Sequence, residues 1–180
     1  VYIVEIYVPS EISTVNLESR GAKSRGYYKV FIDAGHGGTD PGALGYGYRE
    51  SDLNLQVAKK VESKLKSKGI DVKMSRNSDI FYSLSERAEM ANDYGADAFV
   101  SIHQNSAEAK SANGIETYYN RKKEEDRPLS NDIQKQVISQ TGANNRGVKN
   151  AEFTVLVKSK MISALVECGF ITNELEVKKL

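Results

Sequence analysis

The chain has 180 residues, 39% of them hydrophobic, which is typical of one globular domain. Its 25 basic and 24 acidic residues leave a net charge of +1, which argues against strong electrostatic binding to nucleic acid or to an anionic membrane. The single cysteine excludes an internal disulfide, and no apolar run approaches the ~18 residues that a membrane-spanning helix needs.

The first 28 residues differ in character from the rest of the chain. Residues 1–8 are apolar and β-prone, and residues 9–25 are polar with scattered serine, glutamate, glycine and lysine. We interpret residues 1–28 as a short strand or arm and a linker. Position 1 is not methionine, and the chain stops inside a helix-like stretch over 177–180. We therefore expect a fragment whose targeting segment has been removed and whose closing helix is truncated.

From residue 28 onwards, apolar strand-like runs alternate with amphipathic helices. The predicted elements, in order, are a strand over 30–32, a glycine-rich loop over 35–47, a helix over 53–65 closed by Gly69, a strand over 70–74, a helix over 84–94 closed by Gly95, strands over 98–102 and 115–119, a helix over 129–140, and strands over 153–157 and 164–166. This alternation predicts an α/β fold: a largely parallel twisted sheet flanked by helices on both faces, as one domain over 29–180.

Both histidines of the chain follow apolar strand runs. His36 comes just after the first run, and His103 comes just after the third. In open α/β sheets, side chains beyond the carboxyl ends of the strands face one common ligand crevice. The two histidines are therefore expected to meet there, and the glycines around His36 let the backbone bend and leave room for a ligand.

A carboxylate at the start of the first helix, Glu50, completes a possible metal site. Two imidazoles and one carboxylate are the usual three protein ligands of a catalytic zinc, whose fourth position is left for water. Zinc suits hydrolysis because it is a redox-inert Lewis acid. Each residue also has a simpler interpretation: the histidines as hydrogen-bonded loop residues, and Glu50 as a charge that complements a helix N-terminus. Rival carboxylates are Asp33, Asp40 and Asp52.

A further carboxylate, Glu167, ends the apolar run over 164–166. An ionisable group in that place is costly to desolvate unless it has a partner or a task. As a general base it would take a proton from water and pass it to a leaving amine. The alternative is a structural ion pair with an arginine such as Arg146. The neighbouring Cys168 must face the opposite side of the strand, so we predict a buried, inert thiol rather than a nucleophile.

Short motifs extend over nearly the whole chain from about Lys29. They lie at 30–38 and 40–43, at Glu50 with 52–55, at 75–76 with Asp79, at Leu84 with Arg87 and 91–92, at 101–106, at 114–119, at 145–149 and at 165–173. In content and order these motifs resemble those of the zinc-dependent N-acetylmuramoyl-L-alanine amidases of the amidase-3 type.

The resemblance implies that His36, Glu50 and His103 bind zinc and that Glu167 is the catalytic glutamate. It implies that the substrate is peptidoglycan, cleaved at the amide between the lactyl group of N-acetylmuramic acid and the L-alanine of the stem peptide. It also implies an extracytoplasmic place of action, at the bacterial cell wall or secreted. Vegetative growth, spore formation and phage lysis remain open as settings, and so does a possible activating protein partner.

Three further residues are candidates for contacting the glycan or the peptide carboxylates, namely Asn105, Arg76 and Arg146. An arginine can hold a carboxylate through two parallel hydrogen bonds, which suits a peptide substrate. The alternative role for all three is packing and loop support. Two rival functions also stay open: a wall-binding domain without turnover, and a zinc hydrolase that acts on another amide.

Overall fold

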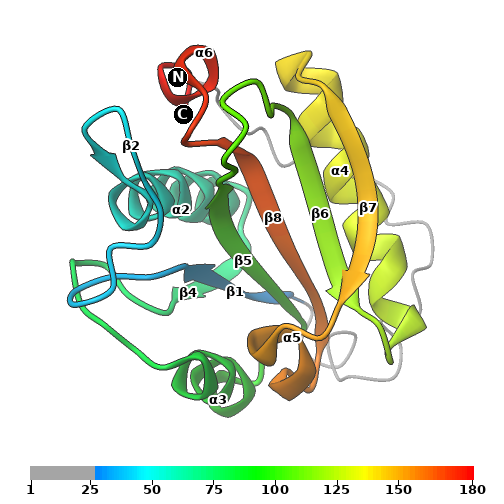
Figure 1. The fold of residues 1–180 in the computed structure, drawn as a ribbon. Coiled ribbons are helices and arrows are strands. Elements are labelled where there is room, and N and C mark those ends of the chain that lie inside the picture. Colours follow the sequence, from blue (N-terminus) through cyan, green and yellow to red (C-terminus); the bar gives the residue numbers. More distant parts are fainter. Residues whose placement is uncertain (1–26) are drawn as a thin grey trace.

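The computed structural model describes residues 27–180, and a six-stranded sheet forms its centre (Figure 1). Across the sheet the strands are β4 (Asp71–Met74), β1 (Lys29–Ala34), β5 (Ala98–Asn105), β8 (Ile162–Phe170), β6 (Ile115–Asn120) and β7 (Asn145–Ala151). Every neighbouring pair is parallel except β8 and β6, which are antiparallel. The predicted α/β fold with a largely parallel sheet is confirmed. The strand expected over 1–8 lies outside the described residues.

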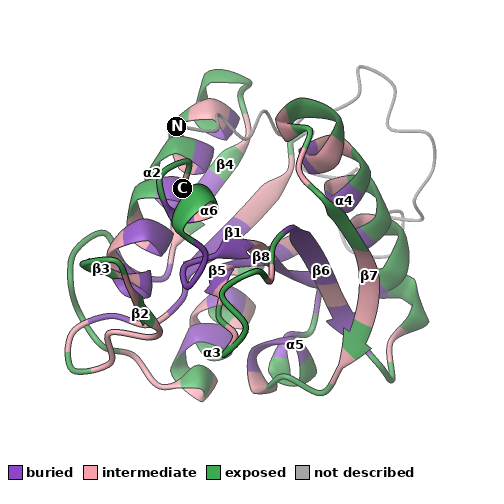
Figure 2. Cartoon of the chain, turned by 45° about the horizontal axis from the view of Figure 1, so that its top comes forward, coloured by how far each residue is buried: buried purple, intermediate pink, exposed green. Residues whose placement is uncertain are grey.

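Helices cover both faces of the sheet, as predicted. One face carries α2 (Glu50–Ser67) and α4 (Arg127–Thr141), and the other carries α3 (Leu84–Tyr94) and α5 (Thr154–Lys158) (Figure 1). Successive strand residues alternate between the two layers. The α2/α4 layer receives Ile32, Val100 and Val166, and the α3/α5 layer receives Phe31, Phe99 and Leu165. Figure 2 shows burial concentrated in these central strands, which explains their continuous apolar runs.

Helix α3 is the element whose bounds the sequence predicted most closely, and capping residues define both of its ends. Its N-cap Ser83 and Glu86 form a reciprocal capping box, so two backbone N–H groups at this end are bonded. At the other end Gly95 adopts the left-handed conformation, with φ 68°. The helix therefore spans the predicted residues 84–94.

Two elements differ from the predictions. Residues 153–157, expected as a strand, instead form the N-cap and most of helix α5, with Val155 and Leu156 buried and Phe153 and Val157 exposed. An apolar run this short carries no periodicity that separates a buried strand from a helical turn. Strand β7 was not predicted, because it is a polar, partly exposed edge strand without an apolar alternation.

The glycine-rich loop contains a small hairpin that was also not predicted, formed by β2 (Leu44–Gly45) and β3 (Tyr48–Arg49). Its two turn residues have positive φ, 51° at Tyr46 and 84° at Gly47, as tight hairpin turns require. The hairpin brings the chain directly into the start of α2.

The C-terminal segment forms one short helix, α6 (Glu174–Val177), and a 3-10 turn, η2 (Glu124–Asp126), precedes α4. Glu176 in α6 accepts hydrogen bonds from the backbone N–H groups of Gly114 and Phe170, each at 2.8 Å. This carboxylate therefore ties α6 to the start of β6 and the end of β8. Within residues 27–180, no helix has the length and apolar character needed to cross a membrane.

A buried ion pair joins α3 to the central sheet. Arg87 donates to Asp33 at 2.8 Å, and the side chains are 2% and 0% exposed. Ser101 donates to the other oxygen of Asp33 at 2.7 Å. Burial alone would raise the pKa of Asp33, but the Arg87 charge and the hydrogen bonds hold that pKa below its ordinary value.

We predict that Arg87→Met lowers the free energy of unfolding by about 3–5 kcal/mol, because it leaves Asp33 as an unpaired buried charge. Urea denaturation followed by circular dichroism measures the change. Adding Asp33→Asn to Arg87→Met should recover part of the loss. Arg49→Met, which breaks exposed pairs with Asp52 and Asp79, is the control and should leave stability nearly unchanged. A small loss for Arg87→Met, matching that of the control, would contradict the prediction.

Candidate metal centre and active site

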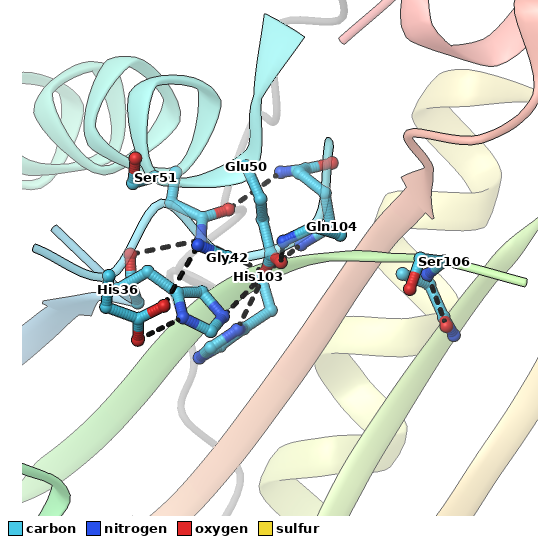
Figure 3. A network of polar contacts seen from close by, with 12 residues as sticks. His36, Gly42, Glu50, Ser51, His103, Gln104 and Ser106 are labelled. Carbon is cyan, nitrogen blue, oxygen red and sulfur yellow. Dashed lines mark hydrogen bonds and ion pairs between the residues drawn. The ribbon is translucent and has the colours of Figure 1, made fainter. Parts of the chain in front are cut away.

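Three residues from distant parts of the chain meet at one edge of the sheet. His36 follows β1, Glu50 begins α2, and His103 lies in β5. One ligand atom from each lies within 4.8 Å of the others. Glu50 Oε1 is 3.2 Å from His36 Nε2 and 2.9 Å from His103 Nδ1, and the side chains point toward one another (Figure 3). The predicted juxtaposition is thus present, although β5 continues to Asn105 and includes His103 instead of ending before it.

The backbone at His36 is held in an unusual conformation. Its φ is 60°, in the left-handed region that few non-glycine residues adopt. Its carbonyl oxygen accepts a hydrogen bond from Arg87 Nη2 at 2.8 Å. On the ring, Nδ1 contacts Asp40 Oδ2 at 2.7 Å, which leaves Nε2 directed at Glu50. A carboxylate on the far nitrogen is the usual way in which metal-binding histidines are oriented.

Two glycines give the three side chains the space they occupy. A Cβ atom at Gly35 would overlap the ring of His103. A Cβ atom at Gly42 would lie 2.7 Å from both Glu50 Oε2 and His36 Cδ2. A side chain at either position would displace a member of the cluster, so these glycines are required by close approach.

Hydrogen bonds fix the carboxylate of Glu50, which is 4% exposed. Its Oε1 accepts from the backbone N–H of Gln104 at 3.1 Å, and its Oε2 accepts from that of Ala43 at 2.9 Å. Burial would raise the pKa of Glu50, but the bonds from His103 and His36 hold it far below its ordinary value. Burial would lower the pKa of His36, but Glu50 and Asp40 raise it to about 9. Glu50 is therefore ionised at neutral pH and lies between the two imidazole rings.

Glu167 lies beside this cluster, as the strand register shows. It is the direct neighbour of His103 across β5 and β8, so both side chains stand on the α3/α5 face of the sheet. Its Oε2 atom is buried and has no hydrogen-bond partner among residues 27–180. Burial raises the pKa of Glu167 to about 7. The alternative ion pair with Arg146 is not formed, because Arg146 bonds to Glu116 instead.

Cys168 packs against the opposite layer, with the residues of the α2/α4 face. The predicted separation of Glu167 and Cys168 to two faces is confirmed. Burial raises the pKa of the Cys168 thiol to about 12, so it stays protonated at neutral pH and is a poor nucleophile.

The rival carboxylates have other partners in the structure. Asp33 is paired with Arg87, and Asp52 pairs with Arg49 at the surface. Asp40 contacts the cluster from outside, through the ring of His36. Its position four residues after His36, in the same glycine-rich loop, was the one sequence signal that could have suggested this orienting contact.

The three candidate substrate contacts occupy different environments. Arg76 is 3% exposed, and its guanidinium donates to the backbone carbonyls of Ala34, Gly35 and Ser51. This geometry favours loop support for Arg76. Asn105 and Arg146, by contrast, both lie at the site: their side chains donate to Glu116 at 2.8 and 2.7 Å.

Glu116 is a site residue that the sequence analysis missed. It lies in β6 directly opposite Glu167, is 3% exposed, and accepts hydrogen bonds from Lys149 and Tyr118 as well as from Asn105 and Arg146. Burial would raise the pKa of Glu116, but the Lys149 and Arg146 contacts lower it to about 2. Glu116 lies in the motif at 114–119, but nothing in that motif marked its carboxylate as a site residue.

The low pKa of Glu116 predicts a pH-dependent contribution to stability. A carboxyl whose pKa is lower in the folded chain stabilises the fold above its unfolded pKa, near 4.5, and loses this effect as the pH falls to about 2. The difference in unfolding free energy between the unmodified chain and Glu116→Gln should therefore shrink, by on the order of 2 kcal/mol, between pH 5 and pH 2. Urea denaturation at each pH measures it, and a constant difference would contradict the assignment.

A histidine–glutamate–histidine cluster beside a buried glutamate, at one edge of an α/β sheet, is typical of metal-dependent hydrolases. Residues 30–180 match the family model Amidase_3, described as N-acetylmuramoyl-L-alanine amidase, and the chain belongs to this family.

Individual relatives agree with this assignment. YqiI of Bacillus subtilis, described as uncharacterized, is 48% identical over 84% of this chain and 74% of its own length. LytC of B. subtilis, an N-acetylmuramoyl-L-alanine amidase, is 44% identical over 84% of this chain but only 31% of its own length. The crystal structure of an N-acetylmuramoyl-L-alanine amidase from Clostridium difficile 630 superposes with a TM-score of 0.83, at 42% identity over 85% of each chain. The CwlD amidase of Clostridioides difficile, solved in complex with the GerS lipoprotein, is 34% identical over 84% of this chain and 87% of its own, with a TM-score of 0.77.

Proposed function

We propose that this chain hydrolyses the amide between the lactyl group of N-acetylmuramic acid and the L-alanine of the stem peptide in peptidoglycan. The observation that carries the proposal is the position of the buried, unpartnered Glu167 next to the His36–Glu50–His103 cluster, in a chain of the Amidase_3 family. Residues 29–180 would form the catalytic domain. A cell-wall substrate places the reaction outside the cytoplasm, at the wall or in a secreted form.

Zinc is the cofactor that we propose for the cluster. Two imidazole nitrogens and one carboxylate oxygen, all within 4.8 Å of one another, match the donors of a catalytic zinc site with three protein ligands. The Asp40 contact behind His36 supplies the expected orienting carboxylate. When bound, zinc supplies a Lewis acid that polarises the amide carbonyl and makes water more acidic.

Glu167 would carry the proton during hydrolysis. Its carboxylate accepts a proton from the attacking water and delivers it to the departing alanine amine, which leaves as a neutral amine. A group that must accept and then donate a proton works best with a pKa near the working pH, and burial raises that of Glu167 to about 7. Its free oxygen, Oε2, has no competing partner in the described part of the chain.

The biological setting and the partners are further proposals. The related CwlD structure contains a lipoprotein, which supports a search for an activating partner of this chain. Relatives include a sporulation-specific amidase and a phage endolysin, so spore formation and lysis are both settings to test beside vegetative growth.

We predict that the zinc-loaded chain releases stem peptides with a free L-alanine amino terminus from purified cell wall, as identified by mass spectrometry. A chelator should abolish release. Glu167→Gln should lower kcat by roughly 10²–10⁴-fold while the metal content stays unchanged, because only proton transfer is lost. Wall binding without release would indicate a binding domain instead, and a different new amino terminus would indicate another amide.

We also predict that His36→Ala loses bound zinc as well as activity, since it removes one of three protein ligands. Asp40→Asn should weaken zinc binding by roughly 10–100-fold, because the ring of His36 loses its orienting carboxylate. Asp52→Asn, at a nearby acidic residue whose carboxylate accepts from Arg49 at the surface, is the matched control. Elemental analysis and chelator competition measure both effects. One full equivalent of zinc in His36→Ala would contradict the ligand assignment.

A further inference from the structure

We propose that Arg146 and Lys149, anchored on Glu116, form a binding site for a carboxylate of the peptide that leaves during the reaction. This inference rests on the proposed amidase function and adds a substrate contact to it. The site would lie on β6 and β7, on the side of Glu167 away from the His36–Glu50–His103 cluster, and it would select substrates by charge.

The strand register places the metal-ligand cluster, Glu167, Glu116 and the two cations in one row across the sheet. His103 in β5 is paired with Glu167 in β8, and Glu167 is paired with Glu116 in β6. Directly paired residues of neighbouring strands share a face and lie about 5 Å apart. Arg146 and Lys149 come from β7, the next strand, and both reach Glu116, at 2.7 and 2.5 Å. The order across the sheet is therefore metal cluster, Glu167, Glu116, and then the two cations.

Within this row, the charges of the group anchored on Glu116 do not balance. Two cations share the single carboxylate of Glu116, which also accepts hydrogen bonds from the neutral side chains of Asn105 and Tyr118. One cation would suffice to neutralise a buried carboxylate, so the group carries a surplus positive charge. The side chains of Arg146 and Lys149 remain 33% and 41% exposed, whereas the side chain of Glu116 is 4% exposed. The surplus charge is thus accessible from solvent.

Arg146 is held in an orientation that leaves hydrogen-bond donors available. Its Nε donates to Glu116, and its Cζ lies 4.9 Å from the centre of the Phe170 ring. Among residues 27–180, Nη1 reaches only the Asn113 carbonyl, at 3.4 Å. A fixed guanidinium with spare N–H groups beside an ammonium is suited to bind a carboxylate.

The direction of the reaction identifies which part of the substrate would lie there. Glu167 gives its proton to the leaving alanine amine, so the peptide continues from Glu167 away from the metal cluster. In that direction the next charged groups are those anchored on Glu116. Stem peptides carry free carboxylates beyond their first alanine, which matches a surplus of positive charge.

The test compares two synthetic substrates, N-acetylmuramoyl-L-alanyl-glutamate with both carboxylates of its second residue free, and the same compound with both of them as carboxamides. The zinc-loaded chain should cleave the carboxylate substrate with a KM about 10-fold lower. Lys149→Gln and Arg146→Gln should each raise that KM toward the value for the carboxamide, with kcat and zinc content nearly unchanged. Each single variant leaves Glu116 one cation, so its charge stays paired.

Two further variants separate recognition from folding. Arg146→Lys should recover part of the preference, because the charge is restored without the planar geometry. Lys122→Met, at an exposed lysine that follows β6 and pairs with Glu152, should behave like the unmodified chain. Equal KM values for the two substrates with the unmodified chain would overturn the inference. So would an equal loss of kcat on both substrates in the Lys149→Gln and Arg146→Gln variants, which would indicate a structural role.

Failure of the proposed function itself gives a different result. If the unmodified chain cleaves neither substrate, the amidase proposal fails, and calorimetric titration of the two compounds into the zinc-loaded chain then decides the subsite separately. Tighter binding of the carboxylate compound that disappears in Lys149→Gln would support the subsite. Equal affinities would overturn it.

Discussion

The active site depends on how the backbone carbonyls of residues 34–36 are held. Arg76 and Arg87, both nearly inaccessible to solvent, donate to these three carbonyl groups in turn. The carbonyl of Gly35 also accepts from Asn54 Nδ2, at 3.2 Å. Buried carbonyl oxygens without any partner would cost about 1–3 kcal/mol each. Two guanidiniums satisfy them together, and the left-handed backbone of His36 persists because its surroundings leave it no alternative.

The sequence alone predicted the layers of the fold and the side chains that converge, and physical reasons explain what it did not predict. Strand ends, helix periods and cap glycines are local signals, so β1, α2 and α3 could be located with His36 and Glu50 between them. Contacts across the sheet are not local. Glu116 is recognisable as a site residue only once β6 is known to lie antiparallel beside β8.

The same difference between local signals and tertiary contacts explains why the roles of Arg76 and Asp40 could not be assigned from the sequence. Both lie in motifs of the family, and neither motif shows whether a side chain turns toward the ligand or toward the backbone. In the structure Arg76 is committed to main-chain carbonyls, while Asp40 reaches the ring of His36 from behind. Burial and hydrogen-bond partners make this distinction, and they depend on the tertiary arrangement.

The reversed direction of β6 and β7 divides the rim of the site into two halves of different origin. The half that holds His36, Glu50 and His103 is built from separate segments between β1 and β5. The opposite half comes from the consecutive residues 115–151. A stretch that is continuous in the gene can be exchanged as one unit. Recombination over that stretch would exchange Glu116, Arg146 and Lys149 as one set, while His36, Glu50 and His103 are inherited unchanged.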